Sequence, residues 1–156
     1  MTRGGHVMAG ACVSIALAVL FWDAHPQAAA CAIAGITAGA NAPDWIEKPL
    51  MLRHRTWTHW PVWWLALLAA SLPAMIFSPL PCLTAGFAVG ALLHLALDIG
   101  TPTGIPLRWP PDGRRRRSLY LYTTGSPAGE AAALAVVVAC CALPVALHGL
   151  FMRYQW

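Results

Sequence analysis

Long segments without charge are the feature that most constrains how this chain folds. Four segments contain no Asp, Glu, Lys or Arg, and they lie between Arg3 and Asp23, Asp23 and Asp44, Arg55 and Asp98, and Glu130 and Arg153. A membrane-spanning helix needs about 20 mostly apolar residues. The first, second and fourth segments fit one span each. The third is about twice as long and is interrupted by Ser-Pro-Leu-Pro at 78–81, so it fits two.

The sequence therefore predicts an all-α integral membrane protein, a single domain over residues 1–156 with a bundle of about five transmembrane helices. The expected helices lie near 7–22, 27–42, 59–78, 82–99 and 130–151. Composition agrees, because only 10% of the residues are charged and 58% are hydrophobic, whereas soluble domains carry roughly 25% charged residues. Residues 1–31 also resemble a secretory signal. His6 at the start of the apolar stretch, and the membrane-like segment that follows, favour a retained helix.

The basic residues predict how the bundle is oriented. If the chain passes up and down, the N-terminus and the loops near 43–58 and 100–129 lie on the same side. Nine of the ten basic residues fall there: Arg3, Lys48, Arg53, Arg55, Arg108 and Arg114 to Arg117. Positively charged loops stay in the cytoplasm, so we expect this side to be cytoplasmic. The orientation of the protein in the membrane is also enough to explain its net positive charge of +4. No nucleic-acid partner is therefore expected.

Histidines and carboxylates are gathered on the same predicted side. They are His6, Asp44, His54, His59, His94 and Asp98. His94 and Asp98 are four residues apart and share a helix face, and ionisable residues within membrane helices are usually functional. Metal binding has three alternatives: a structural His–Asp hydrogen bond, interfacial capping by the other histidines, and a turn role for Asp44. The pattern favours a metal site at the cytoplasmic end of the bundle.

Imidazole and carboxylate ligands favour zinc, with manganese or iron as alternatives. The donors suffice for one to three ions, and paired ions activate water and hold a phosphoryl oxygen. Two further acidic residues are ambiguous. Glu47 is a candidate ligand or pairs with a neighbouring base, and Glu130 is a candidate ligand or a favourable charge at a helix N-terminus.

The five cysteines form no CxxC motif and are expected to be small buried apolar residues.

Basic residues near these ligands predict an anionic substrate. Arg53 and Arg55 flank His54, and Arg114 and Arg115 open a run of four arginines. The alternative for this run is a topology signal that also binds anionic lipid headgroups. Tryptophans at the same end are typical of interfacial anchors. The expected partners are the lipid bilayer and a small-molecule or lipid phosphoester, and the sequence does not indicate an oligomeric state.

Five motifs carry a family resemblance: GGH (4–6), NAPDWIE (41–47), HRTWTH (54–59), GALLHLALDIGTPTGIPLRWP (90–110) and TGSPAGE (124–130). Together they resemble the YdjM-like inner-membrane metal-dependent hydrolases, which are related to zinc-dependent phospholipase C and zinc nucleases. The resemblance implies a bacterial inner-membrane location and metal-ligand roles for the six residues named above. It also implies hydrolysis of a phosphoester, for which Asp44 or Glu47 is the expected general base. The alternative is a non-catalytic metal-binding membrane protein: a transporter, a sensor or a degenerate relative.

Overall fold

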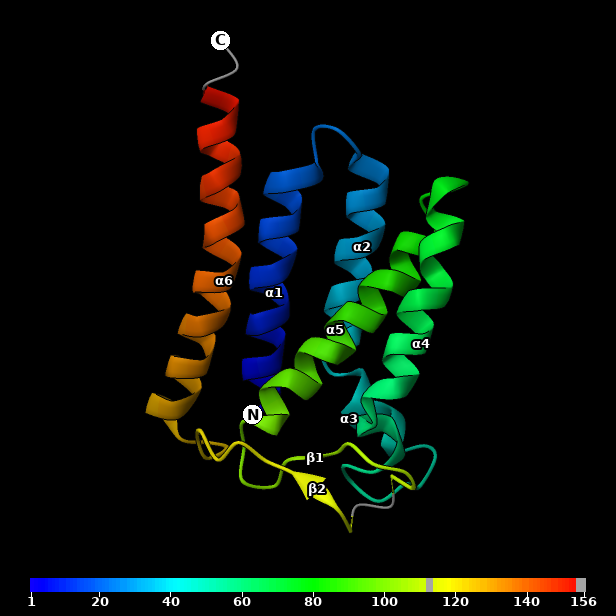
Figure 1. Ribbon diagram of the computed structural model, residues 1–156, viewed down its shortest axis with the longest axis vertical. Coiled ribbons are helices and arrows are strands. Elements are labelled where there is room, and N and C mark those ends of the chain that lie inside the picture. Colours follow the sequence, from blue (N-terminus) through cyan, green and yellow to red (C-terminus); the bar gives the residue numbers. More distant parts are fainter. Residues whose placement is uncertain (112–113, 154–156) are drawn as a thin grey trace.

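The computed structural model describes residues 1–111 and 114–153 and is mostly helical (Figure 1). Its α-helices are α1 (Arg3–Phe21), α2 (Pro26–Gly39), α3 (Ala42–Glu47), α4 (Pro61–Ser71), α5 (Pro81–Ile99) and α6 (Pro127–Arg153). Two 3-10 helices, η1 (Trp57–His59) and η2 (Leu72–Ile76), flank α4. The prediction of an all-α chain misses one short antiparallel ladder between β1 (Ile105–Pro106) and β2 (Arg116–Arg117).

Within the part of the chain that the structure describes, three helices are long and apolar enough to cross a membrane: α1, α5 and α6, with 19, 19 and 27 residues. The other two expected spans are shorter. At 1.5 Å per residue the 14 residues of α2 extend about 21 Å, less than the roughly 30 Å of a hydrocarbon core. The α-helical part of the predicted 59–78 segment is limited to α4, because Pro73 lacks a backbone N–H and the chain tightens into η2. A bundle of five membrane crossings therefore stays a prediction.

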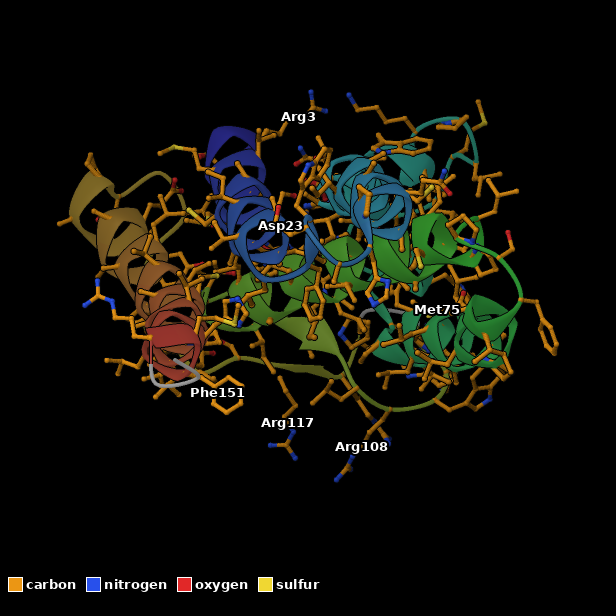
Figure 2. All side chains as sticks on the ribbon, turned by 90° about the horizontal axis from the view of Figure 1, so that it is seen from above. Arg3, Asp23, Met75, Arg108, Arg117 and Phe151 are labelled. Atoms are coloured by element: carbon orange, nitrogen blue, oxygen red, sulfur yellow. The ribbon has the colours of Figure 1, made fainter. Side chains whose placement is uncertain are left out.

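Helix α5 lies at the centre of the arrangement. It packs against α2 and α4, while α1 packs against α2 and α6. Viewed along the helices in Figure 2, α6 lies at one edge of the molecule next to α1. The N-terminus, α3, β1, β2 and the start of α6 lie at the lower end in Figure 1, and the turn between α1 and α2 lies at the opposite end. The five cysteines are all free. The prediction that they are buried holds for Cys82 alone, because Cys140 is exposed and the other three are partly exposed.

Close packing between α2 and α5 depends on residues without side chains. A Cβ atom at Gly86 would meet the backbone carbonyl of Ala32, and one at Gly90 would meet the carbonyl of Ile36. Small residues allow such close approach between membrane helices. The same contact brings Ala40, at the end of α2, next to His94 of α5, whose Nδ1 lies 2.8 Å from the Ala40 carbonyl oxygen.

Replacing Gly86 with leucine is expected to separate α2 from α5 and to destabilise the fold by about 2 kcal/mol, as overpacking a tight contact does. The measurement is thermal unfolding in detergent. Gly149→Leu is the matched control, because a Cβ at Gly149 meets nothing within 4 Å. Equal melting temperatures for the two variants would contradict this account of the α2–α5 contact.

Candidate metal centre

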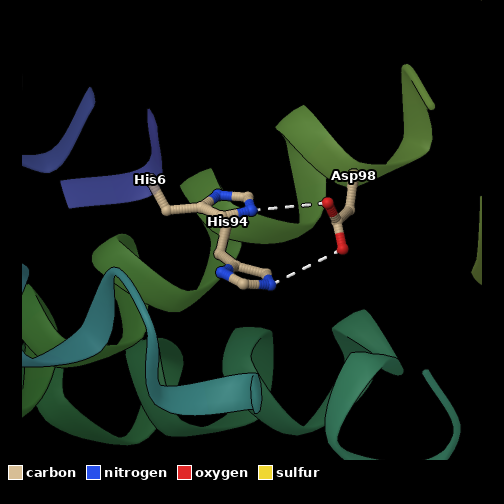
Figure 3. Close-up of side chains that lie close together, drawn as sticks. All are labelled: His6, His94 and Asp98. Atoms are coloured by element: carbon tan, nitrogen blue, oxygen red, sulfur yellow. Dashed lines mark ion pairs between the residues drawn. The ribbon is translucent and has the colours of Figure 1, made fainter. Parts of the chain in front are cut away.

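The six predicted ligand residues come together at the lower end of the bundle. They come from four elements and one loop: His6 from α1, Asp44 from α3, His54 from the following loop, His59 from η1, and His94 and Asp98 from α5. Nitrogen–oxygen separations of 3.4–3.7 Å connect all of them. Figure 3 shows His6 and His94 facing the two carboxylate oxygens of Asp98. The structure thus contains buried His and Asp groups that could hold a metal ion.

Four ligand atoms form the inner set: Asp44 Oδ1, His59 Nε2, His94 Nε2 and Asp98 Oδ2. His59 Nε2 lies 3.4 Å from Asp44 Oδ1 and 3.6 Å from Asp98 Oδ2. His94 Nε2 lies 3.6 Å from each of the same two oxygens. Ligands bound tetrahedrally to zinc at about 2.0–2.1 Å are separated by about 3.4 Å. These four nitrogen–oxygen separations are close to that value. Among the residues that the structure describes, those whose ligand atoms all lie within 4.8 Å of one another form two metal-competent groups: His6, His94 and Asp98, and Asp44, His54 and His59.

The ring nitrogens facing this space are available for coordination. His94 Nδ1 donates to the carbonyl oxygen of Ala40 at 2.8 Å, so its Nε2 carries the lone pair. His59 Nδ1 lies 2.9 Å from Glu47 Oε1. Within the described part of the chain, His59 Nε2, His94 Nε2 and Asp44 Oδ1 are buried without a hydrogen-bond partner. A buried polar atom without a partner is costly, and a cation between these three atoms would remove that cost.

Glu47 orients the histidines. Its Oε1 accepts hydrogen bonds from Thr58 Oγ1 at 2.6 Å and from the Arg55 amide at 2.9 Å, in addition to His59. Its Oε2 lies 2.7 Å from His54 Nδ1. Burial alone raises the pKa of Glu47, but hydrogen bonds from His54, His59 and Thr58 lower the pKa to about 2. Glu47 is therefore ionised, and both imidazoles donate to it.

The carboxylates also set the charge of His59. Burial alone lowers the pKa of His59, but the neighbouring carboxylates of Asp44, Asp98 and Glu47 raise the pKa to about 10. Burial by contrast raises the pKa of Asp44, and its proximity to His59 and His94 brings the pKa well below the usual range. A metal ion would therefore compete with a proton for His59.

Arg55 is buried beside Asp98. Its NH2 lies 2.9 Å from Asp98 Oδ2, and its NH1 donates to Thr101 Oγ1 at 2.8 Å and to the Gly104 carbonyl at 3.4 Å. The residue is only 5% exposed. A substrate-binding role for Arg55 stays a prediction, while in the structure its guanidinium compensates the charge of Asp98.

His6 and Glu130 both lie near the start of α1, but they make different contacts. The His6 ring stacks on His94 with centroids 3.7 Å apart. The Glu130 carboxylate accepts hydrogen bonds from the amide and hydroxyl of Thr2, at 2.8 and 2.6 Å, and from the Gly125 amide at 2.9 Å. Glu130 thus ties α6 to the N-cap of α1. Neither metal-competent group found among the described residues includes it, and its role as a ligand stays a prediction.

A pocket of about 400 Å³ connects the centre with the surface. Its walls are formed by Arg3, Asp44, Glu47, Lys48, Met51, Leu52 and His54. The His54 side chain is 62% exposed and the Asp44 side chain 20% exposed. The metal-competent atoms therefore reach solvent through these two residues, past two basic side chains.

The other predicted substrate residues lie further along the same end. Arg53 and Arg114 line an adjacent pocket with Trp57, and Arg115 is exposed. Arg116 makes a contact that the sequence did not single out, since its NH2 donates to the His54 carbonyl at 2.9 Å. Two further roles were not predicted from the sequence: Thr58 donates to Glu47, and the Ala40 carbonyl accepts from His94. The only sequence feature that pointed to Thr58 is its place within the HRTWTH motif.

Comparison with known proteins identifies the family. Residues 1–154 match the family model described as YdjM inner membrane protein. The chain belongs to the YdjM inner membrane protein family. Inner membrane protein YdjM of Escherichia coli (strain K12) and that of Shigella flexneri are each 36% identical to this YdjM-family protein over 87 residues, which are 53% of the chain and 44% of the relative. The chain thus matches less than half the length of these relatives. No solved structure matches it.

Substituting Glu47 by glutamine is expected to weaken zinc binding by about 10- to 100-fold, because the carboxylate that orients a metal-bound histidine is lost. The measurement is competition with a fluorescent zinc chelator. Asp23→Asn is the matched control, since Asp23 is an exposed carboxylate in the turn between α1 and α2. Unchanged affinity in the Glu47 variant would rule out the orienting role, and complete loss of zinc would make Glu47 a direct ligand.

Proposed function

We propose that this YdjM-family protein is a membrane-bound, metal-dependent hydrolase that cleaves a phosphoester at the cytoplasmic leaflet, with lipid phosphoesters among its candidate substrates. One observation carries the proposal. Buried, unpartnered atoms of Asp44, His59 and His94 converge beside Asp98, at the base of a pocket that opens between basic residues.

Zinc is the proposed metal. The inner set offers two imidazoles and two carboxylates at separations that suit a tetrahedral ion, and no cysteine belongs to the metal-competent groups of the described residues. His6 and His54 provide donors for further ions, so the range of one to three is kept. A bound zinc ion would supply a Lewis acid and would lower the pKa of a bound water molecule toward neutrality.

The chain's own residues supply binding and proton transfer. Arg3 and Lys48 line the pocket and attract an anionic phosphoester. Glu47 fixes Nδ1 of His54 and leaves Nε2 of this exposed ring for a proton. Glu47 itself already accepts four hydrogen bonds. We therefore propose His54 as the proton acceptor, with Asp44 as the alternative.

The cytoplasmic location of the site rests on charge. The end of the molecule that carries the site also carries the basic loops, with nine of the ten Lys and Arg residues of the chain. Positively charged loops remain in the cytoplasm when an inner membrane protein is inserted. The phosphoester would thus be reached from the inner leaflet or from the cytoplasm.

A non-catalytic metal-binding protein is the second candidate, and a specific observation favours it. Four protein atoms surround the inner site, and structural zinc sites have four protein ligands, whereas catalytic sites have three and an open position. Arg55 and the Met1 amine also hold the Asp98 carboxylate, each at 2.9 Å. In this alternative, the ion only stabilises the bundle.

Hydrolysis of bis(4-nitrophenyl) phosphate and of phospholipids by the reconstituted protein separates the two candidates. We expect zinc-dependent turnover that a chelator removes and added zinc restores. His54→Gln should keep the ion held by the inner set and lose at least about 100-fold in kcat, the usual contribution of a general base. His25→Gln, in the turn at the opposite end, should retain activity. Bound zinc without turnover of any phosphoester would favour the non-catalytic candidate.

A further inference from the structure

A second basic pocket lies beside the β ladder, outside the metal centre. It has a volume of about 480 Å³ and is lined by Pro102, Thr103, Arg114, Arg116, Arg117, Ser118 and Tyr120. Among the residues that the structure describes, its lining contains three guanidinium groups and no carboxylate. Figure 2 shows Arg117 pointing outward at this edge of the molecule. The pocket therefore has the charge of an anion site.

Arg116 is held in place with part of its hydrogen-bonding capacity unused. Its NH2 donates to the His54 carbonyl at 2.9 Å. Its Nε is buried and has no hydrogen-bond partner within residues 1–111 and 114–153. A buried charged donor without an acceptor is unfavourable. An anion that accepted a hydrogen bond from this nitrogen would remove the deficit.

The wall of the pocket is held by backbone pairing and by side-chain hydrogen bonds. Arg116 and Arg117 pair with Pro106 and Ile105 in the β ladder. Ser118 Oγ donates to the Thr101 carbonyl at 2.5 Å and accepts from the Tyr120 amide at 3.0 Å. A site preorganised in this way loses little conformational entropy when it binds a ligand.

We propose that this pocket binds a phosphate group through Arg116 and Arg117. Guanidinium groups form paired, charge-assisted hydrogen bonds to phosphate, which no other side chain matches in geometry. Tetrahedral oxyanions fit a pocket lined by several guanidiniums and hydroxyls.

The basic pocket is related to the pocket at the metal centre through shared lining residues. Arg114 lines both this pocket and the adjacent one that contains Arg53. That adjacent pocket shares Met51 and Leu52 with the pocket at the metal centre. Phosphate binding by Arg116 and Arg117 does not rest on the proposed function.

Binding of inorganic phosphate to the full-length protein in neutral-lipid nanodiscs, followed by calorimetry, tests the pocket. Arg116→Gln and Arg117→Gln should each raise the Kd about tenfold, the effect of losing one charge-assisted hydrogen bond. Arg108→Gln is the matched control, because Arg108 is exposed and is not among the residues that line the pocket. The structure shows no side-chain hydrogen bond from Arg117 to the rest of the chain that it describes. Weaker phosphate binding by the Arg117 variant can therefore not be explained by a lost internal contact, as it could be for the Arg116 variant.

Two results would overturn the proposal: no phosphate binding by the wild type, or equal weakening by Arg108→Gln, which would show that overall charge alone attracts phosphate. Phosphatidic acid in the nanodisc identifies the source of the phosphate. If the ligand is a lipid headgroup, phosphatidic acid displaces free phosphate, and if it is a soluble phosphate compound, it does not. The metal content of the same samples separates this proposal from the proposed hydrolase function. Phosphate binding by a protein without metal would argue against the hydrolase and leave the phosphate site standing.

Discussion

The burial of Asp98 is the interaction on which the rest of this structure depends. A carboxylate almost fully removed from solvent at the end of an apolar helix is strongly unfavourable unless cations and hydrogen bonds compensate it. Here the Met1 amine and the Arg55 guanidinium lie 2.9 Å from it, and three imidazoles lie at 3.4–3.6 Å. These partners come from α1 and the residue Met1 before it, the loop before η1, η1 itself and α5. The carboxylate therefore fixes how four parts of the chain meet.

The close contact between α2 and α5 determines which ring nitrogen of His94 faces the carboxylates. It brings the carbonyl of Ala40 to His94 Nδ1, which leaves Nε2 of the same ring directed at Asp44 and Asp98. Glu47 does the same for His59 from α3. Helix packing at glycines thus decides which nitrogen of His94 faces the carboxylates, and the Glu47 carboxylate decides it for His59.

The sequence predicted the helical class and the residues that lie together, because charge-free segments and the positions of His and Asp are visible without a structure. His94 and Asp98 share a helix face by spacing alone. The sequence did not predict the hydrogen-bond partners of Glu47 and Arg55. Those depend on the path of residues 48–56, where Met51 and Arg55 adopt positive φ angles of 51° and 59°, a conformation that hydrophobic periodicity does not reveal. Hydropathy also predicted five spans, whereas helix length supports three.

We propose that Asp44, His59, His94 and Asp98 hold one ion between them. The decisive experiment is to measure zinc content per chain on the purified wild type and on three variants. We expect at least one zinc ion in the wild type and in His25→Ala, and loss of that ion in both His94→Ala and Asp44→Asn. Equal zinc in all four proteins, or none in the zinc-supplemented wild type, would refute this assignment.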